Sequence, residues 1–300
     1  MSGAGDVRAA MVLCAGLGTR LRPLTDELAK PMVPVGDAPA VAHVIARVRL
    51  AVPSRIVINV HHRPDDLRPW AEREGLAVSH EAELLGTAGG VERAALLLGD
   101  GAVLVWNGDI LSSTLAPRDV VAAPAAGATA ATSARLATLV VKARPAGEGN
   151  VGLTAAGRIV RLRKESFGAE SRGAEFLGIH VIGEALRALL PPKGCLVGDV
   201  YLPALRRGEA LHAHVTDASF TDVGSIAEYL AANAAWLAAR GVASWAHPSA
   251  IVNAPIDGSV VGAGAIVDAP ALRSVVWPGA HVQNACNAAV VTPRTTAHAS

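Results

Sequence analysis

Apolar and polar positions follow two different periods in the first third of the chain. The runs at 9–16 and 54–62 are short and apolar and end in glycine or histidine, which is typical of buried strands. Between them, residues 40–51 carry apolar side chains at helical spacing. The alternation continues with an expected helix at 64–74, a strand at 76–81, a helix at 89–99 and a strand at 101–109. This order predicts an α/β sheet whose strands end in polar loops.

The second half of the chain continues with strands, helices and one predicted hairpin. The segment Val120–Ala134 is rich in alanine, and we interpret it as a helix and a connection within the domain. Residues 211–224 have strand character around a polar centre, which predicts a hairpin-like pair. The other expected elements are strands at 137–143, 150–163 and 174–182, and helices at 183–191, 200–208 and 225–241.

From about Ala243 the pattern changes to short apolar residues among Gly, Ala, Pro and Asp. Val260, Ile266 and Leu272 lie six residues apart, which is the spacing of a parallel β-helix. The register slips between Leu272 and Val276, so an irregular β-meander is the alternative. We expect so short a stack to cap the main domain or to build an oligomer interface.

The length and composition limit the class of protein. A chain of 300 residues can bury a large core, and we place one catalytic domain at 1–241 and a small extension at 242–300. Although 51% of residues are hydrophobic, every apolar run falls well short of the roughly 20 residues of a membrane span. The N-terminus shows no apolar region of a secretory signal, which favours the cytoplasm.

Charge and cysteine content exclude further classes. Net charge is +1 and no basic run occurs, so nothing indicates a nucleic-acid partner, and an anionic ligand would need a local site. Cys14, Cys195 and Cys286 are far apart and have no metal-ligand spacing, which suits free thiols in a reducing compartment. His61 and His62 point to opposite faces of a strand, which disfavours a metal site there.

A glycine turn follows the first strand, within "MVLCAGLGTRLRPLTDELAKPMVPV" at Met11–Val35. Gly16 and Gly18 would let backbone N–H groups approach a phosphate chain, since they have no Cβ. A dinucleotide-binding fingerprint would need a third glycine where Leu21 stands, and a P-loop would need Gly-Lys-Ser/Thr. For the glycines alone, a structural turn is the leading interpretation.

The whole string from Gly16 to Val35 resembles the signature of sugar nucleotidyltransferases, the nucleoside-diphosphate-sugar pyrophosphorylases. It departs from that signature at Ala29, where the family usually has proline. Three further segments resemble the family in the same order, namely "SHEAELLGTAGG" (Ser79–Gly90), "VWNGDIL" (Val105–Leu111) and "FTDVGSIAEYLAAN" (Phe220–Asn233). The resemblance implies a Rossmann-like α/β nucleotidyltransferase domain with a mixed central sheet, followed by a short left-handed β-helix-like segment.

The resemblance also implies a reaction and its residues. A sugar-1-phosphate oxygen would attack the α-phosphorus of a nucleoside triphosphate and release pyrophosphate. Arg20 and Lys30 would supply positive charge to the two polyanions, and Asp109 would act with them in catalysis. Asp109 and Asp222 are the implied ligands of Mg²⁺, the expected cofactor.

The motifs further imply nucleotide and sugar contacts. The implied nucleotide-binding residues are Ala15, Gly16, Gly18, Thr19, Glu81, Glu83, Gly86 and Thr87. Glu81 stands where thymidylyltransferase relatives tend to carry Gln, and a carboxylate suits the paired N–H donors of guanine. We therefore expect GTP and mannose-1-phosphate to give GDP-mannose, with Glu83 as the other candidate reader and uridylyl or thymidylyl transfer to another hexose-1-phosphate as the alternative.

The sugar contacts depart from the family pattern. The implied sugar-binding residues are Asn107, Gly152, Lys164, Glu165 and Gly178. Lys164 and Glu165 reverse the usual Glu-Lys-Pro order, so either Lys164 takes over the second phosphate contact or that contact is lost. A non-catalytic nucleotide-sugar sensor and, less well supported, an acyltransferase using the C-terminal coils are the competing functions.

Overall fold

The computed structural model describes residues 7–52, 55–123 and 136–299. The chain divides into two compact units. The first comprises Met1–Ala15, Val44–Pro64 and Arg68–Phe220, and the second comprises Gly16–His43, Asp65–Leu67 and Thr221–Ser300. The domain boundary between residues 241 and 242 stays a prediction. Of the alanine-rich segment, α6 (Pro117–Ala122) covers the start, whereas 124–135 lie outside the described residues.

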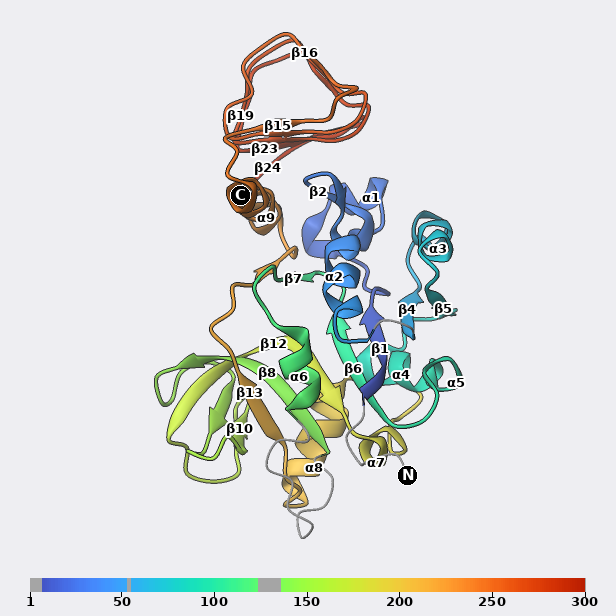
Figure 1. Cartoon of the computed structure of the whole chain (residues 1–300), viewed down its shortest axis with the longest axis vertical. Helices are drawn as coiled ribbons and strands as arrows, with labels where there is room; N and C mark the ends of the chain where they lie inside the picture. The colour runs from blue at the N-terminus through green and yellow to red at the C-terminus, as the bar shows by residue number, and fades with distance from the viewer. Residues whose placement is uncertain (1–6, 53–54, 124–135, 300) are drawn as a thin grey trace. The chain divides into compact units, whose positions relative to one another are not determined.

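A ten-stranded sheet forms the centre of the first unit (Figure 1). Its strands are β1 (Val7–Leu13), β4 (Ile56–Val60), β5 (Ala77–His80), β6 (Ala102–Asn107), β8 (Ala137–Arg144), β9 (Val151–Leu153), β10 (Ile159–Leu162), β11 (Glu165–Ser166), β12 (Arg172–Ile182) and β13 (His212–Val215). The main path runs β11-β10-β9-β12-β6-β1-β4-β5. Strands β6, β1, β4 and β5 are parallel, and β12 is antiparallel to β6. The sheet is therefore mixed, as the family resemblance implied.

Helices connect the strands of this unit. They are α2 (Ala40–Arg49), α3 (Pro64–Arg73), α4 (Gly86–Arg93), α5 (Ala95–Leu98), α7 (Glu184–Arg187), the π-helical turn η3 (Leu196–Tyr201) and α8 (Leu202–Arg206), with the short strand β7 (Ile110–Leu111) after β6. The central strands are almost wholly apolar because parallel strands are covered on both faces. Residues 9–12 of β1, for example, have no exposed surface. Within the ranges that the structure describes, no helix has the length and apolarity needed to cross a membrane.

The predicted hairpin at 211–224 is wrong. Strand β13 pairs in parallel with β8, from His212 opposite Thr138 to Val215 opposite Val141. A parallel partner lies far away in sequence, and its identity cannot be inferred from the local pattern of β13.

Helix α9 (Ile226–Arg240) runs through the second unit. Ser225 caps its start by accepting a hydrogen bond from the Glu228 N–H at 3.3 Å, and Gly241 ends it in the left-handed conformation. The buried Asn233 accepts a hydrogen bond from the Gly36 N–H at 2.9 Å. The other elements before the C-terminal coils are η1 (Thr19–Leu21), α1 (Leu24–Glu27), η2 (Lys30–Met32), β2 (Pro34–Val35), β3 (Ala38–Pro39) and β14 (Thr221–Asp222).

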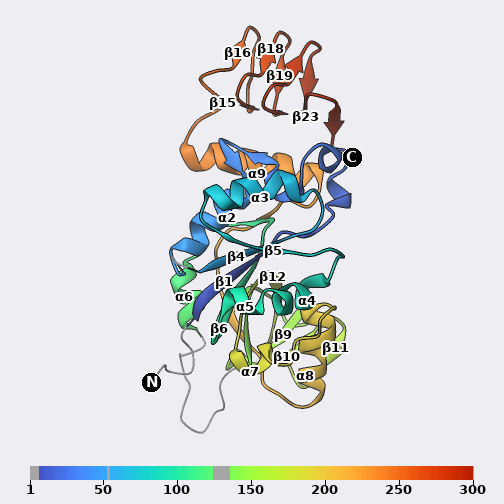
Figure 2. The same ribbon diagram turned by 90° about the vertical axis from the view of Figure 1, so that its right-hand side faces the viewer.

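The C-terminal coils form a parallel β-helix within the second unit. Its strands are β15 (Trp245–Ala246), β16 (Ile251–Val252), β17 (Val260–Val261), β18 (Ile266–Val267), β19 (Ala271–Leu272), β20 (Val275–Val276), β21 (His281–Val282), β22 (Cys286–Asn287), β23 (Ala289–Val291) and β24 (Thr296–His298). Figure 1 shows the three-sided coils end-on, and Figure 2 shows their stacking from the side. Equivalent strands on successive coils pair in parallel, for example β17 with β20 and β20 with β23. This pairing confirms the β-helix and excludes the irregular β-meander.

The coil length differs from that of a regular six-residue repeat. Ser259 and Ser274 occupy the same place on successive coils and are separated by 15 residues. The three sides of a coil are unequal, because successive strands begin at Val260, Ile266, Ala271 and Val275. The buried Ser259 hydroxyl accepts a hydrogen bond from the Ser274 N–H at 2.9 Å, and the Ser274 hydroxyl accepts one from the Ala289 N–H at 3.2 Å. These serines satisfy the backbone at one corner of each coil. The register slip after Leu272 is therefore the short side of every coil.

Candidate functional site

The glycine loop of the second unit closes over the stem of Lys30. Gly18 has φ +64°, and a Cβ placed there would lie 2.7 Å from Thr25 Cγ2 and 3.0 Å from Lys30 Cβ. The Thr25 hydroxyl donates a hydrogen bond to the Gly18 carbonyl at 3.0 Å. Only glycine combines this backbone conformation with so close an approach. The loop therefore fixes the position of the base of the Lys30 side chain.

The rest of the loop is open to solvent. Gly16 has no heavy atom within 4 Å of the place where a Cβ would stand, and Thr19 is exposed at the start of η1. The departure at Ala29 has a structural counterpart, because its N–H donates to Asp66 Oδ2 at 2.9 Å. Proline could not make that hydrogen bond.

Arg20 and Asp222, which are far apart in the sequence, lie together in the second unit. Arg20 Nη2 is 3.8 Å from Asp222 Oδ2, and the two side chains are 68% and 36% exposed. Gly224 makes room for this pair, because a Cβ there would lie 2.7 Å from Arg20 Nη2 and 2.9 Å from Glu228 Oε2. An exposed ion pair contributes under ~1 kcal/mol, so Arg20 is free to exchange its partner for a phosphate oxygen.

In the first unit, the predicted base-recognition segment packs against and is hydrogen-bonded to the residues around the start of η3. A Cβ on Gly86, whose φ is +76°, would lie 2.5 Å from the Gly194 carbonyl oxygen. The Gly194 N–H donates to Leu85 O at 2.8 Å, and the Leu196 N–H donates to Thr87 Oγ1 at 2.8 Å. The position of the backbone at Gly86 and Thr87 is therefore fixed by its contacts with Gly194 and Leu196.

The two predicted base readers differ in environment. Glu83 is exposed and accepts a hydrogen bond from Lys193 Nζ at 2.6 Å, which lowers the pKa of the Glu83 carboxyl. Glu81 is only 1% exposed. Of the two, Glu83 is therefore the one that a ligand can reach.

The end of β6 brings further predicted residues together. A Cβ on Gly178 would lie 2.5 Å from Asn107 Nδ2, so β12 needs glycine where it passes Asn107. Asp109 follows in the next turn, near the buried Cys14. Burial raises the pKa of the Cys14 thiol well above its ordinary value, and the Asp109 carboxylate raises this pKa further. Ala15 is buried at 5% exposure beyond β1.

The other three predicted sugar residues, Gly152, Lys164 and Glu165, lie on β9, in the turn before β11 and on β11. A Cβ on Gly152 would overlap Glu170, which forms a half-buried ion pair with Arg161 at 2.7 Å. Arg206 holds Glu165 as a fork, with Nε 2.9 Å from Oε2 and Nη2 2.6 Å from Oε1. Lys164 is exposed. Glu165 is therefore oriented by a guanidinium that the sequence motif does not contain.

The carboxylate of Asp222 suits a magnesium ion that is completed by a substrate. No group of three or more His, Cys, Asp and Glu side chains gathers anywhere in the described part of the chain. Mg²⁺ commonly takes one or two carboxylates and fills its other positions with phosphate oxygens and water. Asp222 offers a partly exposed carboxylate of this kind, and Asp109 is the predicted ligand in the first unit. The metal stays a prediction.

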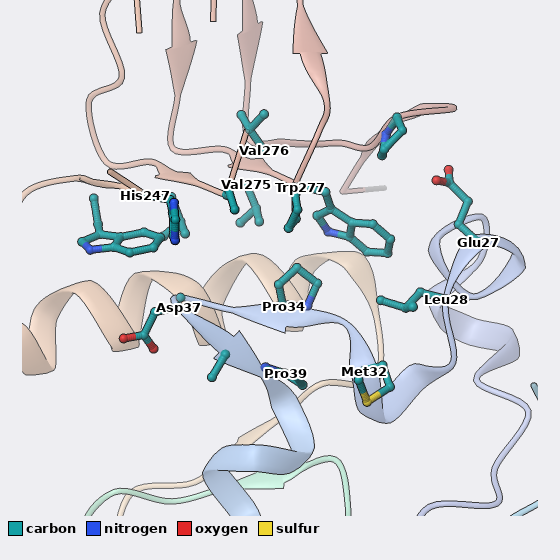
Figure 3. Close-up of a pocket in the computed structure, with 18 of the residues that line it drawn as sticks. Glu27, Leu28, Met32, Pro34, Asp37, Pro39, His247, Val275, Val276 and Trp277 are labelled. Carbon is teal, nitrogen blue, oxygen red and sulfur yellow. The ribbon is translucent and has the colours of Figure 1, made fainter. Parts of the chain in front are cut away.

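The second unit also contains a cavity of about 540 Å³. Figure 3 shows Val275, Val276 and Trp277 of the β-helix on one side and Pro34 and Pro39 on the other. Of the described residues that line this cavity, none belongs to the predicted nucleotide or sugar site. We therefore assign it no part in the chemistry.

Comparison with known families identifies the fold and its motifs. The model of the family described as nucleotidyl transferase matches residues 9–163, just over half of the chain. The chain belongs to the nucleotidyl transferase family. The match includes the glycine loop, Lys30, the base-recognition segment and Asp109, whereas the predicted motif at Phe220–Asn233 lies beyond the matched residues.

Curated relatives of this nucleotidyl transferase differ in the base and sugar that their names state. A mannose-1-phosphate guanyltransferase from Aspergillus fumigatus is 39% identical over 110 residues, which are 34% of this chain and 30% of the relative. An N-acetylmuramate alpha-1-phosphate uridylyltransferase from Caulobacter vibrioides is 41% identical over 108 residues, 33% of this chain and 45% of the relative. The chain thus matches less than half the length of either.

Solved structures share the fold of this nucleotidyl transferase. HddC from Yersinia pseudotuberculosis, solved with GMP-PN, superposes with a TM-score of 0.62 at 20% identity. The superposition covers 77% of this chain and all of that chain. The α/β nucleotidyltransferase fold is confirmed.

Three residues that hold predicted site residues in place were themselves not predicted. Asn59 donates a hydrogen bond from its side-chain amide to Glu81 Oε1 at 2.7 Å. It is buried within the otherwise apolar β4, and that single polar position was the signal available in the sequence. Lys193 and Arg206 have no local signal, because each acts on a carboxylate distant in sequence.

Proposed function

We propose that this nucleotidyl transferase joins a nucleoside triphosphate to a sugar-1-phosphate and releases pyrophosphate. The observation that carries the proposal is the glycine loop of the second unit, in which Gly18 fits against the stem of Lys30. Family membership and the named activities of the relatives support it.

The proposed chemistry needs positive charge at two polyanions. A phosphate oxygen of the sugar-1-phosphate attacks the α-phosphorus, the bond from that phosphorus to the β-phosphate bridging oxygen breaks, and pyrophosphate leaves. Lys30 neutralises charge at the α-phosphate, and Arg20 binds the phosphate tail as a planar fork after leaving Asp222. Positioning and charge neutralisation carry the reaction, without a covalent intermediate.

The remaining roles follow from the predicted sites. Mg²⁺, when bound, would neutralise phosphate charge, and we propose Asp222 and Asp109 as its carboxylate ligands. We propose Gly16, Thr19, Gly86 and Thr87 for nucleotide contacts. For the sugar-1-phosphate we propose Asn107, Gly152, Lys164, Glu165 and Gly178.

For the substrates we propose GTP and mannose-1-phosphate. The guanyltransferase relative supports this choice, and the exposed carboxylate of Glu83 can accept the paired N–H donors of guanine. Uridylyl transfer is the second candidate, because the uridylyltransferase relative is as similar as the guanyltransferase.

The test is a substrate panel. The purified chain is incubated with Mg²⁺, each of four nucleoside triphosphates and a set of hexose-1-phosphates and N-acetylmuramic acid-1-phosphate, and pyrophosphate release is measured. We expect turnover with GTP and mannose-1-phosphate, loss of most of it in Lys30→Ala, and little change in the control Lys142→Ala on β8. Absence of turnover across the panel would reject the enzyme and favour the sensor.

A further inference from the structure

A chain of buried hydrogen bonds links the ends of three parallel strands in the first unit. The Cys14 N–H, just beyond β1, donates to Asn59 Oδ1 at 2.7 Å. Asn59 Nδ2, on β4, donates to Glu81 Oε1 at 2.7 Å. Glu81 follows β5, and its Oε2 accepts a hydrogen bond from the Leu85 N–H at 3.1 Å. Both carboxylate oxygens of Glu81 therefore face donors of the protein itself.

The surroundings of Glu81 leave no place for a base beside its carboxylate. The residue is 1% exposed, and Asn59 is 3% exposed. Helix α4 passes so close that a Cβ on Gly90 would lie 2.8 Å from both Asn59 Nδ2 and Glu81 Oε1. A side chain that reads a base must present its oxygens to the ligand, and this carboxylate presents them inward.

We propose that Glu81 is a positioning residue, which with Asn59 holds the Leu85–Thr87 backbone in place and does not contact the base. This inference rests on the proposed nucleotidyl transfer and changes the role that the sequence motif implies for Glu81. Base preference is then set by groups that reach solvent, such as Glu83 with its partner Lys193.

The network explains why a carboxylate occupies position 81. Two N–H donors, from Asn59 and Leu85, converge on the side chain, and only a carboxylate offers an acceptor to each. In Glu81→Gln, one donor would face the new amide NH₂ group, and a buried donor without an acceptor is costly. Asn59→Asp would instead place a second carboxylate against Glu81.

Exchanging the two groups restores every bond. In the double variant Asn59→Asp/Glu81→Gln, the carboxylate introduced at position 59 accepts from the Cys14 N–H and from the side-chain amide introduced at position 81. The carbonyl oxygen of that amide accepts from the Leu85 N–H. The network again holds one carboxylate and one amide, with the direction of the central bond reversed.

The experiment measures kcat and KM for GTP and UTP in the wild type, both single variants and the double variant. We expect each single variant to lose about tenfold or more in kcat/KM for both nucleotides, mainly through a higher nucleotide KM. The ratio between GTP and UTP should stay unchanged, and the double variant should regain most of the loss. A changed ratio in Glu81→Gln, or a double variant no better than the singles, would overturn the inference.

Unfolding in urea separates this inference from the proposed function. Should the wild type turn over no nucleotide, the proposed function fails, and the same four proteins are compared by their free energies of unfolding. Recovery of stability in the double variant supports the paired network, and a double variant as unstable as the singles overturns it. If the single variants do not fold, the double variant alone decides the test. A double variant that folds and binds nucleotide supports the inference, and one that does not fold overturns it.

Discussion

Replacing Gly18 with alanine tests whether the glycine loop controls the position of Lys30. Alanine at φ +64° costs about 1–2 kcal/mol in backbone energy. Its methyl group would also meet Thr25 Cγ2 at 2.7 Å and Lys30 Cβ at 3.0 Å, and such crowding typically costs about 1–3 kcal/mol. We expect a clear loss of stability in urea, followed by tryptophan fluorescence, and a large loss of pyrophosphate release.

Gly16→Ala is the matched control from the same motif. No heavy atom lies within 4 Å of the place that a methyl group at position 16 would take, and Gly16 does not adopt the left-handed conformation. The free energy of unfolding should therefore change by less than ~0.5 kcal/mol. The added methyl group should raise the KM for the nucleotide, because it lies where the backbone is proposed to approach phosphate. If Gly18→Ala unfolds at the same urea concentration as Gly16→Ala and keeps full turnover, the steric reasoning is refuted.

Two further predictions concern side chains outside the glycine loop. Arg206→Ala releases Glu165 and should raise the KM for the sugar-1-phosphate while leaving the KM for the nucleotide unchanged. Because the Arg206–Glu165 pair is exposed, a loss in the free energy of unfolding far above ~1 kcal/mol would contradict this assignment. Burial and Asp109 raise the pKa of Cys14, so its thiol stays protonated and buried at pH 8, whereas Cys195 and Cys286 are partly exposed and within reach of a thiol reagent. Iodoacetamide should therefore add two adducts to the folded chain by mass spectrometry and a third only after unfolding, whereas rapid labelling of Cys14 in the folded chain would show that it is not buried.

The sequence was informative wherever chemistry is encoded locally. The string from Gly16 to Val35 resembled the family signature within one continuous stretch, and the family match covers it. The central strands were equally readable, because parallel strands buried on both faces have an almost unbroken apolar pattern. These features depend on neighbours in the chain.

Features that depend on distant partners could not be predicted. Nothing near Glu165 indicates that Arg206 will hold it, and nothing near Glu83 indicates Lys193. The coil length was also missed, because Val260, Ile266 and Leu272 lie on three successive strands of one coil and their six-residue spacing does not extend to β20, which begins at Val275. A sequence pattern reports which residues are apolar, but the length of a corner depends on which backbone groups it must satisfy.

Burial divides the predicted site residues into those that can touch a substrate and those that place them. Arg20, Glu83 and Lys164 are exposed, and each can exchange solvent or a surface partner for a ligand at small cost. Glu81 cannot do so, because moving its carboxylate outward would leave the Asn59 amide and the Leu85 N–H without acceptors in a buried place. A sequence motif does not distinguish residues that touch the substrate from residues that position them. Substitutions at exposed positions should therefore alter the base specificity of this nucleotidyl transferase. Substitutions at Glu81 should instead weaken the binding of all nucleotides to a similar extent.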